Sequence, residues 1–392
     1  MLATLTLLTA LALASPGDWP EPRHNPHLTA VQPTAGAMRD APGVVAQWDL
    51  GRRHPAITPV TQASGELLGI AVVAGALYCY DTAGNSHWKS HPPGLNYELL
   101  VAARDLNGDG SIELLLQAGR SMMPYGAAVL VSLDTGDVLW RYDVEPMSYA
   151  WYLYAGKYVA GAPGEQIVVL MHGYPPDPKN GYIAMFSYAD SGAAPEQRWR
   201  HDFEQYTCFP SLLQSDLDGD GAKEIVAQTH SRMWFLDAEN GAVKQFLLWD
   251  VAPANVRSYG LVRFVDLDLD GREDFLCIAN FAQHHEVLLN KDGRMEKAWH
   301  HGWDESVTTG KVATVYTDPP YADLDGDGRF EVVVSMFNSE DKEEWLLRGY
   351  DAVTGELKYR MPGVVAEALS DLDRDGQTEM LANRTHDPTR ST

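Results

Sequence analysis

Residues 215–226, SDLDGDGAKEIV, place acidic side chains at alternate positions and then turn into an apolar run. Carboxylates occupy loop positions 1, 3, 5 and 9, and the glycines between them let the backbone wrap tightly. Alternate positions in such a loop direct their oxygens to one point, and carboxylates gathered there need a counter-ion. The stretch therefore predicts a divalent-cation loop that leads into a β-strand.

The motif recurs along the chain. Intact copies begin at Asp105, Asp216, Asp266, Asp323 and Asp371. Two eroded copies, at residues 63–72 and 161–170, keep a glycine and the apolar run but lack the aspartates. Together they make seven copies with a spacing of about 50 residues, which is typical of the four-stranded blades of a β-propeller.

A second element alternates with the loops. It is an apolar arm, an Asp or Asn, a glycine turn and a second arm that often carries Trp, as in VLVSLDTGDVLWRYDV (129–144). This pattern is typical of a β-hairpin, and it occurs six times. One repeat is then a strand, a loop, a strand and a hairpin. We expect an all-β fold, a seven-bladed β-propeller of four-stranded blades.

The ends of the chain predict how the ring closes. The repeat after Asp371 stops without a hairpin, whereas residues 44–51 (VVAQWDLG) resemble a lone second arm with Trp48 at the place of Trp140. We expect this N-terminal strand to complete the last blade and remove an exposed sheet edge. One inner strand of the last blade is then still unaccounted for: either the tail after Arg384 supplies it or the natural chain continues beyond Thr392. Residues 44–392 then form a single propeller whose last blade is incomplete.

Export is expected from the N-terminus. Residues 1–14 contain an apolar run and a small-x-small site at Ala12-Leu13-Ala14, as a secretory signal peptide does, and residues 15–43 follow as an N-terminal extension. No later stretch approaches the ~18 apolar residues of a membrane-spanning helix. We expect a monomer that is secreted, periplasmic or held at the cell surface.

Charge and cysteine content narrow the classes of partner. The formal net charge is -24, with 54 acidic against 30 basic residues, which argues against a nucleic-acid partner and suits cation binding. Three scattered cysteines, Cys79, Cys208 and Cys277, do not form a disulfide framework. They are expected to be buried thiols.

The loops are not EF-hands. An EF-hand needs a bidentate Glu at position 12 and then a helix. Position 12 is occupied here by Leu116, Ala227, Cys277, Val334 and Ala382. Strand-forming residues follow, so the helix is missing as well.

The D-x-[DN]-x-D-G-x-x-[DE] loop entering a strand resembles the FG-GAP/VCBS repeats of integrin α-subunit propellers and secreted microbial proteins. The hairpins LDTGDVLW and YDAVTGEL are similar to those of PQQ-type propellers. The resemblance implies about five calcium sites and none at the eroded loops. The implied ligands are Asp105, Asn107, Asp109, Glu113; Asp216, Asp218, Asp220, Glu224; Asp266, Asp268, Asp270, Asp274; Asp323, Asp325, Asp327, Glu331; and Asp371, Asp373, Asp375, Glu379.

No nucleophile, phosphate or zinc motif stands out, so the catalytic residues are unknown. The preferred interpretation is a calcium-binding module for a glycan or an extracellular protein. The alternative is a calcium-dependent polysaccharide lyase of the rhamnogalacturonan lyase type. The side chains considered for chemistry or sugar stacking are His284, His285, His300, His301, Lys157, His172, Arg257 and the aromatic residues of 149–158. A surface or hydrogen-bonding role for the histidines and a core role for the aromatic segment remain open alternatives.

Overall fold

The computed structural model describes residues 57–385, apart from 92–93, 95, 120–125, 145–150, 172–180, 190–192, 204–210, 222, 230–231, 249–260, 279–284, 302–311 and 339–344. Regular structure in this part of the chain consists of β-strands, and neighbouring strands pair antiparallel. No helix in it is long and apolar enough to cross a membrane.

The strands form seven sheets, numbered here in chain order. Sheet 1 contains β1 (Ile57–Thr61), β2 (Leu67–Val73), β3 (Ala76–Tyr80) and β4 (Ser86–Ser90). Sheet 2 contains β5 (Tyr97–Arg104), β6 (Glu113–Ala118), β7 (Gly126–Ser132) and β8 (Val138–Val144). Sheet 3 contains β9 (Trp151–Gly156), β10 (Gln166–Met171), β11 (Tyr182–Ser187) and β12 (Glu196–Asp202).

The next two sheets repeat the pattern, and the last two vary it. Sheet 4 contains β13 (Ser211–Ser215), β14 (Glu224–Thr229), β15 (Arg232–Leu236) and β16 (Val243–Leu248). Sheet 5 contains β17 (Leu261–Val265), β18 (Asp274–Ile278), β19 (His285–Lys291) and β20 (Arg294–His301). Sheet 6 contains β21 (Val312–Val315), β22 (Tyr321–Ala322), β23 (Glu331–Asn338), β24 (Trp345–Asp351) and β25 (Leu357–Pro362), with β22 beside β23. Sheet 7 contains β26 (Val364–Ser370) and β27 (Glu379–Arg384).

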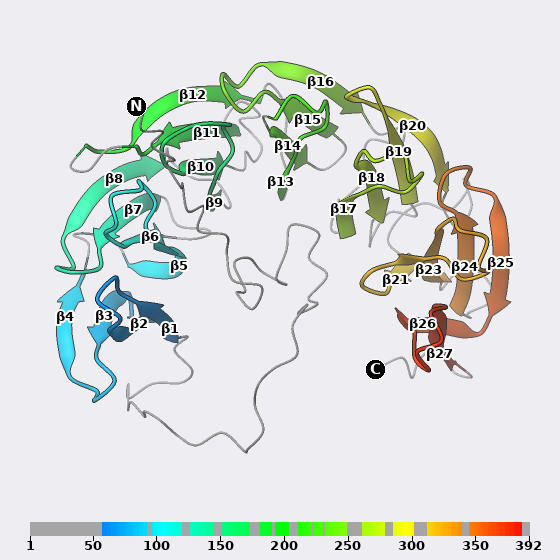
Figure 1. The fold of residues 1–392 in the computed structure, drawn as a ribbon, viewed down its shortest axis with the longest axis horizontal. Helices are drawn as coiled ribbons and strands as arrows, with labels where there is room; N and C mark the ends of the chain where they lie inside the picture. The colour runs from blue at the N-terminus through cyan, green and yellow to red at the C-terminus, as the bar shows by residue number, and fades with distance from the viewer. Residues whose placement is uncertain are drawn as a thin grey trace, which may run out of the picture.

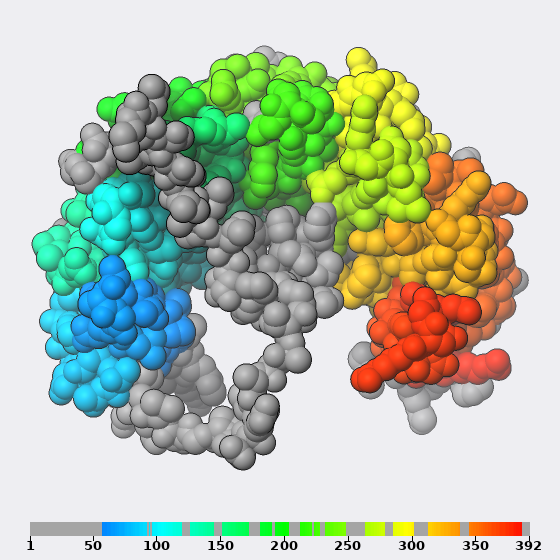
Figure 2. Space-filling view, in the orientation of Figure 1, coloured from blue at the N-terminus to red at the C-terminus, as the bar shows by residue number. Residues whose placement is uncertain are grey.

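The sheets follow one another around an arc in chain order (Figure 1). The first strand of each of the first six sheets lies toward the centre, and the last strand, such as β8 or β16, lies on the outside. A gap separates the first and last described sheets in the space-filling view (Figure 2). Antiparallel four-stranded sheets arranged radially in this way are the architecture of a β-propeller.

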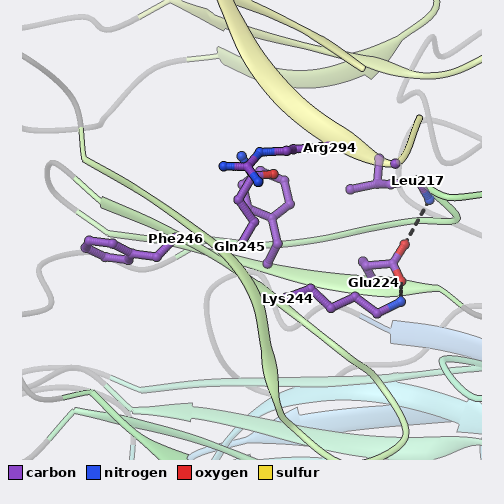
Figure 3. A pocket seen from close by; sticks show the side chains of 8 residues that line it. Leu217, Glu224, Lys244, Gln245, Phe246 and Arg294 are labelled. Carbon is purple, nitrogen blue, oxygen red and sulfur yellow. Dashed lines mark hydrogen bonds and ion pairs between the residues drawn. The ribbon is translucent and has the colours of Figure 1, made fainter. Parts of the chain in front are cut away.

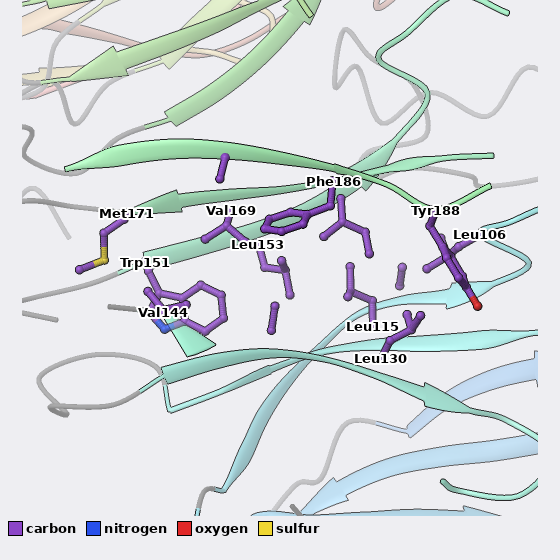
Figure 4. Close-up of a cluster of buried hydrophobic side chains, with 14 of the residues drawn as sticks. Leu106, Leu115, Leu130, Val144, Trp151, Leu153, Val169, Met171, Phe186 and Tyr188 are labelled. Atoms are coloured by element: carbon purple, nitrogen blue, oxygen red, sulfur yellow. The ribbon is translucent and has the colours of Figure 1, made fainter. Parts of the chain in front are cut away.

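The core lies between successive sheets. The second strands are buried on both faces, which explains the uninterrupted apolar runs of β6 and β10. The outer strand β8 alternates between exposed and partly buried residues because one of its faces meets solvent. Figure 4 shows the cluster between sheets 2 and 3, where Leu115 and Leu130 meet Val169 and Phe186.

Three of the five intact loops each contribute a buried leucine to the core between their own sheet and the next one. Leu106, Leu217 and Leu267, at loop position 2, are 1%, 3% and 1% exposed because the following sheet covers them. The equivalent Leu372 in sheet 7 is 57% exposed, and Leu381 on β27 is 52% exposed. The outer face of sheet 7 thus presents apolar side chains that the other sheets bury.

Tryptophans on outer strands fasten neighbouring sheets. The indole N–H of Trp88 donates to Leu133 O of sheet 2 at 2.7 Å; Trp199 donates to Ala238 O of sheet 4 and Trp299 to Ala352 O of sheet 6, at 2.9 and 2.8 Å. Each ring lies on a turn glycine of the receiving sheet, namely Gly136, Gly241 and Gly355. These glycines have φ of 71–76°, and a Cβ on any of them would lie within 2.7 Å of the ring. Glycine is therefore required both by the backbone conformation and by the lack of space beside the ring.

The repeat structure predicted from the sequence is present in the described residues. Loops and hairpins fall where the motifs place them, and the last sheet lacks the hairpin that its sequence lacks. The proposed signal peptide, the extension at 15–43 and the closing strand at 44–51 lie outside the described residues, so closure stays a prediction. Cys79 and Cys277 are buried free thiols, and burial raises the pKa of Cys79 to about 11; Cys208 falls in one of the gaps.

Candidate metal centres in the repeated loops

The five intact loops lie between the first strand of a sheet and the next strand of the main ladder. In the loops of sheets 2, 4 and 6, the first Asp accepts backbone N–H bonds from the glycines at positions 4 and 6. For Asp105 these are Gly108 N at 2.7 Å and Gly110 N at 2.9 Å. Asp216 and Asp323 repeat the pair. The acidic side chains therefore shape the loop itself.

Two loops hold this conformation without glycine at position 4. Leu269 and Arg374 have φ of 59° and 68°, in the left-handed region that other L-residues avoid at a cost of about 1–2 kcal/mol. Their first aspartates, Asp266 and Asp371, accept from the amides at positions 5 and 6 instead. The same wrapped loop thus forms from a less favourable sequence.

The carboxylate at position 9 ties the loop to the sheet. One oxygen accepts the N–H of the position-2 leucine in all five loops, as Glu113 does from Leu106 N at 2.9 Å and Asp274 does from Leu267 N at 2.8 Å. Glu113, Glu224, Asp274 and Glu331 are at most 3% exposed. Burial raises the pKa of Glu113 to about 7 and also raises that of Asp274, because an anion in a buried site loses hydration. A nearby cation would offset that loss.

The predicted ligands converge in four loops. Ligand atoms lie within 4.8 Å of one another in these groups: Asp371, Asp373, Asp375 and Glu379; Asp216, Asp218 and Glu224; Asp266, Asp268 and Asp274; and Asp323, Asp325 and Glu331. Such oxygen-only sets suit a hard cation with several oxygen ligands, as Ca²⁺ requires. Asp220, Asp270 and Asp327 are not part of these groups.

The Asp105 loop differs at position 3. There Asn107 Oδ1 accepts Asp109 N at 3.0 Å, and its amide nitrogen lies 3.1 Å from Asp109 Oδ2. An amide oxygen remains a suitable calcium ligand, but the set carries one less negative charge than the others.

Two lysines that the sequence analysis did not consider enter two of the loops. Lys244 Nζ lies 2.5 Å from Glu224 Oε1 and 3.0 Å from Asp218 Oδ2. Lys358 Nζ lies 2.7 Å from Glu331 Oε1 and about equally close to two further carboxylates of its loop. A signal was present in the sequence, because each lysine stands three residues after a turn glycine, in NGAVKQF and TGELKYR.

The eroded loop of sheet 3 replaces the buried carboxylate with an amide. Gln166 Oε1 accepts the N–H groups of Tyr158 and Val159 at 2.8 and 2.9 Å. The side chain is 1% exposed, and its nitrogen donates to Gly164 O. A neutral group therefore holds the loop to the sheet where the acidic pattern is lost.

The other residues considered for chemistry or sugar stacking lie in different places in the described part of the chain. His285 is buried with Nε2 3.2 Å from Met336 Sδ, His300 is exposed, and His301 Nε2 lies 2.7 Å from Gly355 O. Trp151 and Tyr158 pack in cores, which favours the structural role for that segment. Lys157 is exposed. His172, Arg257, His284 and residues 149–150 lie outside the described part of the chain.

A pocket of about 290 Å³ lies beside the Asp216 loop, between sheets 4 and 5 (Figure 3). Glu224, Lys244, Gln245, Phe246 and Arg294 line it, together with Leu217, Phe235 and Gly293. Gln245 spans the two sheets, since its amide donates to Met295 O and accepts from Met295 N at 2.7 and 2.9 Å. Residues about fifty positions apart build this pocket, so no local motif indicates it.

Comparison with known proteins gives likenesses in fold. No protein-family model matches the chain, and no curated protein matches it. Among solved structures, Sqt1 of Saccharomyces cerevisiae is similar at 8% identity and a TM-score of 0.42, over 81% of this chain and 90% of that one. An Agrocybe aegerita lectin specific for non-reducing terminal N-acetylglucosamine is similar at 17% identity and 0.37, over 79% of each chain. The exotype rhamnogalacturonan lyase YesX is similar at 14% identity and 0.35, over 84% and 70%. All three scores are low, and the likenesses carry no functional inference.

Proposed function

We propose that the chain is an exported, calcium-binding β-propeller that acts as a binding module, with a glycan as the favoured ligand. The observation that supports calcium is the convergence of carboxylate oxygens in the loops, with all four expected ligands together at Asp371, Asp373, Asp375 and Glu379. Calcium tolerates irregular sets of six to eight oxygens, whereas magnesium demands strict octahedral geometry. Backbone carbonyls and water would complete the coordination of each ion.

The pocket between sheets 4 and 5 supports a glycan ligand. The Phe246 ring packs beside Trp234 on the face of sheet 4 toward sheet 3, so the apolar side chains of this pocket are Leu217 and Phe235. Arg294 brings guanidinium donors to the same pocket. Apolar side chains next to hydrogen-bond donors suit a sugar ring, and the volume is close to the lower end of the ~300–1,000 Å³ of small-molecule sites.

Binding to a glycan array with and without calcium tests this function. We expect Arg294→Ala to weaken binding to any glycan hit about tenfold, equivalent to about 1.4 kcal/mol. Leu357→Ala, which changes an exposed residue on the outer strand of another sheet, serves as the control and should bind like the parent. Unchanged binding by Arg294→Ala would show that the ligand sits elsewhere or is a protein.

The same glycan hits distinguish the lyase alternative. A lyase leaves an unsaturated product that absorbs in the near ultraviolet, whereas a binding module leaves its polysaccharide intact. Of the lysine, histidine and arginine considered for that reaction, only Lys157 falls within the described residues. We expect no rise in absorbance, and a rise would replace the binding module with an enzyme.

We also propose that the ring has seven blades and is closed by residues 44–51. The support is the exposed apolar face of sheet 7, where Leu372 and Leu381 lack the covering that Leu106 and Leu217 receive. Deleting residues 15–51 should lower the melting temperature, measured by circular dichroism. Deleting only residues 15–43 keeps the proposed strand and should leave the melting temperature unchanged. Equal melting temperatures for the two truncations would contradict closure by this segment.

A further inference from the structure

The two lysines that enter acidic loops contact the same loop positions. Lys244 Nζ approaches Asp218, Asp220 and Glu224 at 3.0, 4.0 and 2.5 Å. Lys358 Nζ approaches Asp325, Asp327 and Glu331 at 2.9, 3.0 and 2.7 Å. In both loops these are positions 3, 5 and 9, which supply three of the four side chains of the proposed calcium set.

A β-bulge directs each lysine into its loop. In sheet 4, Phe235 pairs with Gln245 and the next pair is Leu236 with Val243, which leaves Lys244 as the extra residue. Lys358 is the extra residue in the same way between Tyr359 and Leu357 of sheet 6. A bulge re-aims the side chain of its extra residue, and here it points that side chain toward the loop of its own sheet.

The same bulge occurs in two of the other loop-bearing sheets, where its extra residue is uncharged. Sheet 2 has Leu139 as the extra residue, and sheet 5 has Ala298. Lys291 does reach Asp268 of the sheet 5 loop, at 3.2 Å, but it is 48% exposed and this is its one carboxylate contact among the described residues. Within that part of the chain, no lysine or arginine pairs with the Asp371 loop. The five loops therefore fall into two classes.

An ammonium group and a calcium ion would compete for the same oxygens. Calcium binds oxygen at about 2.3–2.6 Å, and Nζ of Lys244 is already at hydrogen-bond distance from two of those oxygens. Glu224 and Glu331 are 3% and 0% exposed, and a buried carboxylate is stable only with a partner. The lysines provide that partner permanently, without an ion from solution.

We propose that Lys244 and Lys358 are built-in counter-ions, so that the loops at Asp216 and Asp323 do not take up calcium, whereas those at Asp105, Asp266 and Asp371 do. This inference rests on the proposed calcium binding of the latter loops. It also means that the wall of the pocket formed by Glu224 and Lys244 does not depend on calcium.

The number of bound ions tests the proposal. Metal-stripped chain is dialysed to equilibrium against calcium chloride, and bound calcium per chain is measured by mass spectrometry. We expect three ions for the parent chain and five for the double variant Lys244→Met/Lys358→Met. Lys157→Met, which removes an exposed lysine away from the loops, is the matched control and should bind three.

A reciprocal variant covers the case in which the double variant does not fold. Leu139 is 45% exposed, so Leu139→Lys is tolerable, and it places an ammonium over the Asp105 loop from the equivalent bulge. It should reduce the count from three to two. Five ions on the parent chain, or a count that Leu139→Lys does not lower, would overturn the counter-ion role and leave calcium binding intact. No bound calcium on any variant would overturn the proposed function itself.

Discussion

Removing calcium should lower the melting temperature by about 10 °C or more. An ion that binds only the folded chain stabilises it by mass action, and a site filled at about 100 times its dissociation constant contributes about 2.7 kcal/mol. Three such sites would sum to about 8 kcal/mol, and 1 kcal/mol corresponds to about 2–4 °C in domains of 150–250 residues, with somewhat smaller shifts in larger ones. The measurement is a thermal scan by circular dichroism before and after a strong chelator, on protein whose metal content has been determined.

One loop offers a sharp control for this experiment. Asp371→Asn leaves one side-chain oxygen where the loop uses two, and it removes a negative charge from the cation site. It should therefore reduce the calcium-dependent gain in melting temperature. Gln166→Glu adds a carboxylate to the eroded loop of sheet 3, which lacks the aspartates of the intact loops. It serves to separate the effect of a local charge from that of metal binding. Metal-containing protein that melts at the same temperature after chelation would refute a stabilising role for calcium.

Truncating Trp299 should destabilise the fold by about 3–5 kcal/mol, the usual cost of removing a large buried aromatic side chain. Trp299 is 7% exposed, donates its indole N–H to Ala352 O at 2.8 Å, and lies against Gly355 of the next sheet. Trp299→Ala removes the packing and leaves the carbonyl without this donor. The free energy of unfolding is obtained from urea titration followed by tryptophan fluorescence and circular dichroism.

The control for that variant lies on the same strand. Glu296 is exposed on β20, and Glu296→Ala should change stability by no more than about 0.5 kcal/mol, as surface substitutions usually do. Equal urea midpoints for the two variants would mean that the indole contributes nothing to the packing of sheet 5 against sheet 6.

Much of the architecture could be predicted from the sequence because each repeat carries its own local signals. The acidic loop, the apolar strand after it and the glycine hairpin are defined within a few residues of one another, so the run from Asp105 to Val144 already specifies most of a sheet. The absence of a hairpin after Asp371 was likewise predictable and leaves sheet 7 with two described strands.

The features that the sequence did not reveal depend on register and on contacts between sheets. Lys244 looks like an ordinary outward-facing residue until the pairing of Leu236 with Val243 makes it the extra residue of a bulge. The pocket joins Gln245 to Arg294 across two sheets, and the partner of Trp199 is a carbonyl 39 positions away. Such contacts are fixed by three-dimensional packing, for which a single sequence carries no local signature.

The direction of the tryptophan contacts has a consequence for biosynthesis. Trp88, Trp199 and Trp299 each precede their acceptors Leu133, Ala238 and Ala352 in the chain. During translation each of these three indoles leaves the ribosome before the turn that receives it has been made. Sheets 1, 3 and 5 can therefore complete this contact only after the following sheet has been synthesised.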